Sequence, residues 1–135
     1  MGSRREGAAW REHPSPEYHS FDEYFPHYVS QHGQAATRWL HFAGTHVAAA
    51  AAAVALLKRR PAGLLAVPLI SYGVAWGSHL VIERNRPATF EHPLWSLRGD
   101  LRMIGMMWQG RDDELIRIVR DQRTILLDRG DPNRS

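Results

Sequence analysis

The run WLHFAGTHVAAAAAAVALL, residues 39–57, decides the fold because it contains no Asp, Glu, Lys or Arg. At ~1.5 Å per residue its nineteen residues form a helix of roughly 28 Å, about the thickness of a membrane's hydrocarbon core. The polar turn Lys58-Arg59-Arg60 follows, and then a second uncharged run, PAGLLAVPLISYGVAWGSHLVI, at residues 61–82. Two such runs joined by a tight turn predict an antiparallel helical hairpin over residues 39–82.

More polar segments flank the hairpin and predict shorter helices. Residues 19–32 have aromatic side chains at helical spacing, and Ser20 is suited to cap the start of that helix. Pro26 falls inside the same segment and predicts a kink or a break. Residues 94–108 predict an amphipathic or interfacial helix, and residues 112–128 predict an amphipathic helix with one apolar stripe.

These elements predict an all-α fold: a small helical membrane protein with a central antiparallel transmembrane hairpin plus flanking amphipathic helices. We expect a flexible leader at residues 1–16, a single helical membrane domain at 17–128 and a flexible tail at 129–135. Alanine is only weakly lipophilic, and residues 39–57 are rich in it. A soluble helix pair buried in a globular core is therefore the alternative to the membrane interpretation.

Composition excludes several classes of function. The chain has no cysteine, so a disulfide, a thiolate metal site and a thiol nucleophile are excluded, and any bound metal must use histidine and carboxylate. The net charge of +3 comes from scattered basic residues rather than from a Lys/Arg block, which argues against a nucleic-acid partner. There is also no Gly-rich dinucleotide-binding fingerprint.

Several of the eight histidines fall at one end of the predicted hairpin. His41 lies nineteen residues before the turn centre near residue 60, and His79 lies nineteen residues after it, so an antiparallel hairpin places both at the same height. His32 precedes the first run and His92 follows the second, at that same end. Three or four imidazoles suit Fe, Zn, Cu or Ni. The alternative is that each histidine only hydrogen-bonds a backbone carbonyl.

Charged residues accompany the histidines. Glu83 is four residues after His79 and therefore lies on the same helical face. Arg38, Arg84 and Arg86 flank the same end, where they are suited to contact lipid headgroups. One of these arginines can instead hold a carboxylate in a bidentate pair.

The chain resembles a known family over roughly residues 20–108. The resemblance is carried by FPHYVSQH-(x8)-H-FAGT at residues 25–45 and by PLISYGVAWGSHLVIERNRPATFEHPLWSLRGD at residues 68–100, with SHLVIERNRPA at 78–88 as its most specific part. These segments resemble a bacterial family long described as a domain of unknown function. That family is related to the yeast endoplasmic-reticulum 2-hydroxy fatty acid dioxygenase, which acts in phytosphingosine breakdown to odd-chain fatty acids.

The resemblance implies an Fe(II)-dependent dioxygenase that shortens a long-chain 2-hydroxy fatty acid by one carbon with O2, a fatty acid α-oxidation. The substrate supplies all the electrons, so no second organic cofactor is implied. The implied iron ligands are His32, His41 and His79, with His92 in reserve. Glu83 is implied as a catalytic residue, either a fourth ligand or the group that orients His79, and Arg86 as the partner of the substrate carboxylate.

Together these features predict an integral protein, in a bacterial inner membrane, in contact with membrane lipid, with no nucleic-acid partner and with a possible homo-oligomer. Two other functions compete with the dioxygenase. One is a non-catalytic membrane scaffold or interaction module that docks through the helix at 112–128. The other is a histidine-based metal-handling membrane protein, which would bind metal without consuming oxygen.

Overall fold

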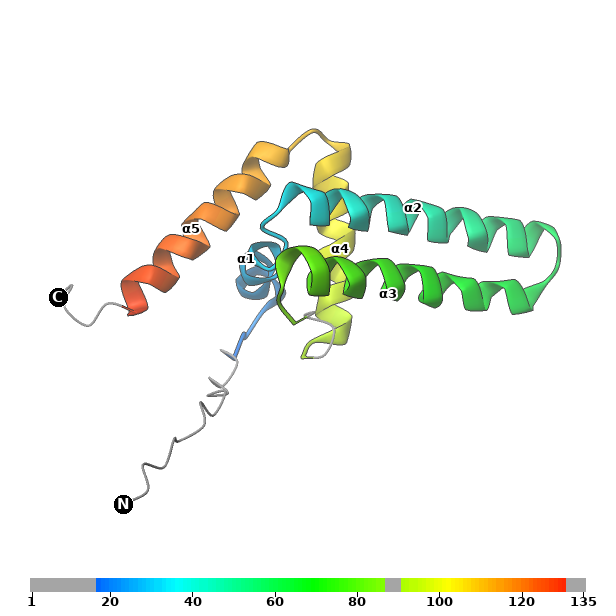
Figure 1. Ribbon diagram of the computed structural model, residues 1–135, viewed down its shortest axis with the longest axis horizontal. Helices are drawn as coiled ribbons and strands as arrows, with labels where there is room; N and C mark the ends of the chain where they lie inside the picture. The colour runs from blue at the N-terminus through cyan, green and yellow to red at the C-terminus, as the bar shows by residue number, and fades with distance from the viewer. Residues whose placement is uncertain (1–16, 87–90, 131–135) are drawn as a thin grey trace, which may run out of the picture.

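The computed structural model describes residues 17–86 and 91–130, and every regular element in these ranges is a helix. A long hairpin projects from a base of shorter helices, and one base helix crosses the hairpin near its root (Figure 1). The elements, in chain order, are α1 (Phe21–Ser30), α2 (Ala35–Leu57), the 3₁₀ helix η1 (Pro61–Leu65), α3 (Ala66–Ser78), the π-helical turn η2 (His79–Glu83), α4 (Pro93–Trp108) and α5 (Asp112–Gly130).

The hairpin closes through a short turn and close contacts between its two arms. Arg59 adopts a left-handed backbone conformation with φ 52°, and Pro61 then starts η1. A Cβ on Gly63 would lie 2.9 Å from the Cβ of Ala55, so only glycine permits this approach at the turn. A Cβ on Gly44 would lie 3.1 Å from a methyl carbon of Val74, which shows how closely α2 and α3 pack.

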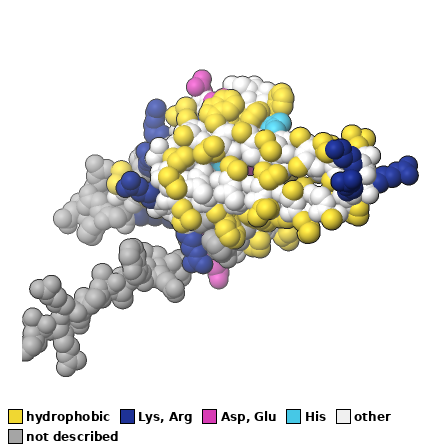
Figure 2. All heavy atoms as spheres, turned by 45° about the vertical axis from the view of Figure 1, so that its right-hand side comes forward, with side chains coloured by type: hydrophobic (Ala, Val, Ile, Leu, Met, Phe, Trp, Pro, Cys, Tyr) yellow, Lys and Arg dark blue, Asp and Glu magenta, His cyan; other side chains and the backbone are white. Residues whose placement is uncertain are grey.

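The hairpin's apolar side chains face outward. Helices Ala35–Leu57 and Pro61–Glu83 are each long and apolar enough to cross a membrane, and only 22% and 11% of their most apolar windows are buried. The helix of a soluble core would be mostly buried instead. Leu57, Leu65 and Leu69 are 84%, 75% and 76% exposed, and leaving one leucine side chain in water costs about 1.5–3 kcal/mol. Figure 2 shows this apolar surface along the hairpin, with basic side chains at its two ends.

The base of the molecule holds the compact core. Tyr24, Val29, Met103 and Leu115 come from α1, α4 and α5 and are fully buried together. The Ser20 side chain accepts a hydrogen bond from the Glu23 amide and caps α1, as the sequence predicts. Phe42 of α2 packs against this core, so the core joins the hairpin at its root.

The predicted architecture is confirmed, with adjusted boundaries. The hairpin begins at residue 35 rather than 39 and reaches residue 83, and the two C-terminal helices run over 93–108 and 112–130. Of the kink or break predicted at Pro26, the break does not occur, because α1 continues through the proline; the proline removes only one donor there, and the buried face of α1 is held by packing. The predicted leader at residues 1–16, and residues 131–135 of the predicted tail, lie outside the described chain.

Candidate metal centre

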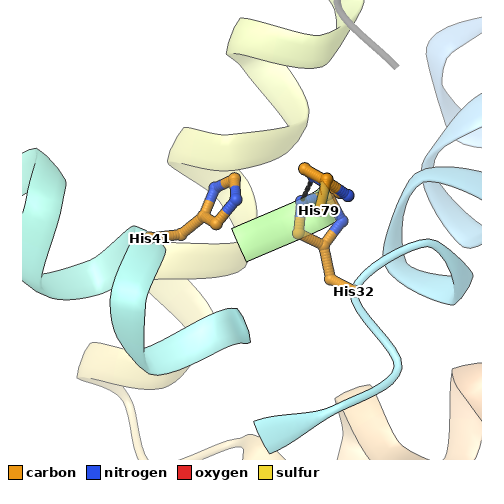
Figure 3. A group of neighbouring side chains, drawn as sticks. All are labelled: His32, His41 and His79. Carbon is orange, nitrogen blue, oxygen red and sulfur yellow. Dashed lines mark hydrogen bonds between the residues drawn. The ribbon is translucent and has the colours of Figure 1, made fainter. Parts of the chain in front are cut away.

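Three buried histidines converge where the hairpin meets the base. His32 lies in the turn after α1, His41 on α2, and His79 at the first position of η2. One ring nitrogen of each lies within 4.8 Å of the others, and the three residues are only 1%, 7% and 2% exposed. Figure 3 shows the three rings pointing toward one another from separate segments. The register of the hairpin accounts for the pairing of His41 with His79, and α1 brings His32 to them.

The Nδ1 atom of each ring is held by an oxygen atom. His32 Nδ1 lies 2.8 Å from the Tyr28 carbonyl oxygen, His41 Nδ1 lies 2.8 Å from Asp100 Oδ1, and His79 Nδ1 lies 2.7 Å from Asn85 Oδ1. A carbonyl, a carboxylate and an amide oxygen only accept hydrogen bonds, so each Nδ1 must carry its proton and donate it. In a neutral ring this leaves Nε2 with a free lone pair.

In neutral rings the Nε2 atoms then face one another without protons. His32 Nε2 and His79 Nε2 are 3.0 Å apart (dashed in Figure 3), and His41 Nε2 is buried with no hydrogen-bond partner among the described residues. Two facing lone pairs at this distance repel unless a shared proton or a cation lies between them, and an unpaired buried acceptor costs about 1–3 kcal/mol. A metal ion bound by all three Nε2 atoms resolves both conflicts. The donor set therefore fits a metal ion whose ligands are oriented through their opposite ring nitrogens.

Burial keeps His32 in the neutral form that a metal requires. Burial, and next the neighbouring rings of His41 and His79, lower the pKa of His32 well below its ordinary value of 6.5. Arg38 donates hydrogen bonds to the carbonyl oxygens of His32 (2.9 Å) and Gly33 (3.1 Å), which fixes the turn that presents the ring.

Asn85 orients His79, and the π-helical turn brings it there. The chain leaves η2 through Arg84, which is left-handed at φ 56°, and the Asn85 amide returns to the His79 carbonyl at 3.1 Å. The Asn85 Nδ2 group donates to the Gln31 carbonyl at 2.9 Å, and this bond fixes its Oδ1 toward His79. Such widened turns occur often at functional sites.

Asp100 orients His41 from the crossing helix α4. Its carboxylate accepts hydrogen bonds from His41 Nδ1–H, from the Tyr28 hydroxyl at 3.2 Å and from the Thr45 hydroxyl at 3.3 Å. Burial, and next the Asp100 carboxylate, raise the pKa of Tyr28 well above its ordinary value of 10.0, so the phenol stays a donor. Gly99 permits the approach, because a Cβ there would lie 2.8 Å from the Tyr28 ring.

A cavity of about 290 Å³ opens beside the three histidines. Its polar end includes the histidines, Thr45 and Asp100, and its walls are formed by α3 and α4. Among the described residues, no Lys or Arg lines this cavity. A buried polar end that continues into an apolar channel suits an amphiphile.

Comparison with known proteins places this chain in a family. The family described as "2-hydroxy-palmitic acid dioxygenase Mpo1-like" matches residues 18–112. The chain belongs to this family. No curated protein and no solved structure gives a significant match.

In this Mpo1-like chain the other predicted site residues lie outside the three-histidine group. Glu83 Oε1 accepts a hydrogen bond from the Gln34 amide at 2.7 Å, so it joins the two arms of the hairpin at the base while Asn85 contacts His79. Arg86 is exposed and does not line the cavity. His92 stacks on Trp95, with ring centroids 5.4 Å apart.

Sequence reasoning missed Asp100, Asn85 and Arg38 as supports of this Mpo1-like centre. Asp100 did carry a signal, because it is the only acidic residue between 93 and 108, in a helix expected to pack on one face. Asn85 lies in the motif of residues 78–88. Only the path of the turn shows that Asn85, rather than Glu83, contacts His79. Arg38 was expected at lipid headgroups, but it is 4% exposed.

Proposed function

We propose that this chain is an Fe(II)-dependent dioxygenase that shortens a long-chain 2-hydroxy fatty acid by one carbon. One 2-hydroxy acid and one O2 give the acid one carbon shorter, CO2 and water. The carbon–carbon bond next to the carboxyl group breaks, and the substrate supplies all four electrons. The family match supports the substrate class, since the family's name specifies 2-hydroxy-palmitic acid.

One observation carries the proposal. The Nε2 atoms of three histidines converge, and the Nδ1–H group of each ring donates its hydrogen bond to an oxygen atom elsewhere. His32, His41 and His79 would hold the metal. Imidazole ligands alone suit Fe, Zn, Cu or Ni, but zinc has no redox chemistry and a dioxygenase needs it. Bound Fe(II) would supply the one-electron chemistry through which O2 reacts with the 2-hydroxy acid.

The chain's own residues orient and shield the site. Asp100 and Asn85 hold the rings of His41 and His79 with Nε2 facing inward. Tyr28 donates to Asp100 and lies with its ring centroid 4.4 Å from that of His32, which closes one side against water. Because none of the described residues on the cavity wall is cationic, the substrate carboxylate would be bound by the metal and by the hydroxyl groups around it.

We further propose that residues 17–128 form a single membrane domain, in a bacterial inner membrane. The two apolar helices support this, because their exposed leucines and valines are stable in lipid and unfavourable in water. The histidines lie at the end of the hairpin opposite Lys58–Arg60, near one membrane surface, where a polar head group can reach them while its acyl chain remains in lipid.

The test is oxygen uptake by protein purified anaerobically in detergent and loaded with Fe(II), with and without 2-hydroxyhexadecanoic acid. We expect uptake that depends on the acid and yields pentadecanoic acid and CO2. His41→Ala should abolish both bound iron and uptake. The matched control is His46→Ala on the same helix, because His46 bonds the Phe42 carbonyl and the Trp108 indole and not the centre.

Each competing function predicts a different result. Stoichiometric iron without any uptake would contradict the dioxygenase and favour metal handling. No bound metal at all would favour the non-catalytic module. The apolar stripe that this module would use is partly occupied in the structure, since Leu115 and Val119 of α5 are buried in the core with α1.

A further inference from the structure

The cavity beside the histidines extends along one face of α3. Residues Val67, Ser71, Ala75 and His79 all line it, at intervals of four residues, so they lie on one side of the helix. His79 lies twelve positions after Val67, which corresponds to about 18 Å at 1.5 Å per residue. The cavity is therefore a groove that runs from the histidines toward the turn of the hairpin, within a helix long and apolar enough to cross a membrane.

The groove opens sideways between α3 and α4. Leu97 and Leu101 on α4 line it and are also 59% and 57% exposed. Tyr72 on α3 lines the groove and is 46% exposed. Side chains that line a cavity and also contact the surroundings mark its mouth. This mouth lies between α3 of the hairpin and the helix α4 that crosses it (Figure 1), and its exposed side chains are apolar or aromatic, so lipid would surround it.

The groove also changes in polarity along its length. Its inner end carries the histidines with Asp100 and Thr45, and its far end carries Val67 and Pro68. A ligand that fits has one polar end and a long, narrow apolar remainder. An unbranched acyl chain attached to a 2-hydroxy acid head has this form, whereas a compact polar ligand would leave the apolar walls unpaired.

We propose that the groove between α3 and α4 binds the acyl chain of the substrate, which enters sideways from the lipid, and that the distance from the histidines to Val67 sets the longest chain accepted. This inference rests on the proposed function for the identity of the head group. Ser71 lies about 12 Å from His79 along the helix, eight residues at 1.5 Å. A larger side chain at Ser71 should therefore obstruct a long chain and admit a short one.

The test compares 2-hydroxyhexadecanoic and 2-hydroxyoctanoic acid binding to the full Fe(II)-loaded chain under anaerobic conditions. Excluding only two methylenes from an apolar site weakens binding by about tenfold, so Ser71→Leu should raise the Kd of the long acid at least that much. The Kd of the short acid should stay within about twofold, since its burial is unchanged. The matched control is Gly73→Leu, which adds the same side chain to α3 at a position where a Cβ meets nothing within 4 Å.

A second variant tests the groove even if Ser71→Leu does not fold. Val67→Trp fills the far end and should weaken only the long acid, and less than Ser71→Leu does. Equal effects on both acids, or no effect of either variant, would overturn the proposal. Anaerobic binding needs no turnover, so this test is independent of the proposed activity. A chain that binds the long acid selectively but consumes no oxygen would contradict the dioxygenase proposal and still support the acyl-chain groove.

Discussion

Replacing Asp100 by Asn tests whether the centre depends on the orientation of His41. The substitution keeps the size of the side chain but removes its charge, and it places an NH2 group among three donors: His41 Nδ1–H, the Tyr28 hydroxyl and the Thr45 hydroxyl. The hydroxyls can rotate, but Nδ1–H must find an acceptor or the ring must turn. Turning the ring would move Nε2 away from the other two nitrogens.

The expected loss is in metal affinity. Removing the group that orients a metal-binding histidine commonly costs 10–100-fold in affinity, which corresponds to about 1.4–2.7 kcal/mol. Hydrogen bonds to a charged group contribute about 1.5–3 kcal/mol each, so the three bonds to Asp100 can account for this change. We expect the affinity of Asp100→Asn for Co(II), used as a spectroscopic substitute for Fe(II), to fall within that range.

The assay is competition for Co(II) against a chelator of known affinity, read from the visible absorption of the bound ion. Asp22→Asn is the matched control, because that carboxylate pairs with Arg102 on the surface and its side chain is 86% exposed. The reasoning is refuted if Asp100→Asn binds Co(II) as tightly as the unchanged chain and with the same spectrum while His41→Ala binds none.

Three further predictions concern packing, the metal and pH. Gly99→Ala should destabilise the fold by about 1–3 kcal/mol in chemical denaturation, because its Cβ would clash with the Tyr28 ring; Gly105→Ala on the same helix, where nothing lies within 4 Å, should not, and equal effects would contradict the close approach. Metal at a hundred times its Kd should stabilise the unchanged chain by about 2.7 kcal/mol. This gain should appear as a higher melting temperature that a chelator reverses. An equal gain in a His79→Ala chain would rule out this site. Burial lowers the pKa of His27 below its ordinary 6.5, so the unfolded chain binds more protons below that pH and stability falls as pH drops through 6.5. His27→Gln should flatten the loss of unfolding free energy measured between about pH 7 and 5.5, and an unchanged slope would count against the shift.

The hairpin could be predicted because its determinants are local. Two uncharged runs separated by Lys58-Arg59-Arg60 specify two helices and a turn, and the antiparallel arrangement then places His41 opposite His79 by counting alone. His32 was included on the same logic, since it directly precedes the first helix. No tertiary information was needed for these steps.

The groups that orient the histidines could not be predicted in the same way. Asp100 reaches His41 only because α4 crosses the hairpin, and that crossing depends on the contact between Gly99 and Tyr28, seventy-one residues apart in the chain. Asn85 replaces Glu83 beside His79 because the last turn of the second arm is π-helical, which shifts every later side chain around the axis. Helical periodicity assumes an unbroken α-helix, so it predicted that Glu83, four residues after His79, lies beside that histidine.

The same geometry suits a bound metal better than a catalytic histidine that carries protons. A general base must exchange a proton at a nitrogen that faces substrate, and its other nitrogen needs only one stable partner. Here three rings meet with their inner nitrogens unprotonated, and two of those nitrogens are 3.0 Å apart. Protonating one ring would relieve that pair but leave the buried His41 Nε2 still without a partner among the described residues. A single cation bound by all three atoms would satisfy the whole group, and it would link the α1 turn, α2 and η2 at the point where the hairpin joins the base.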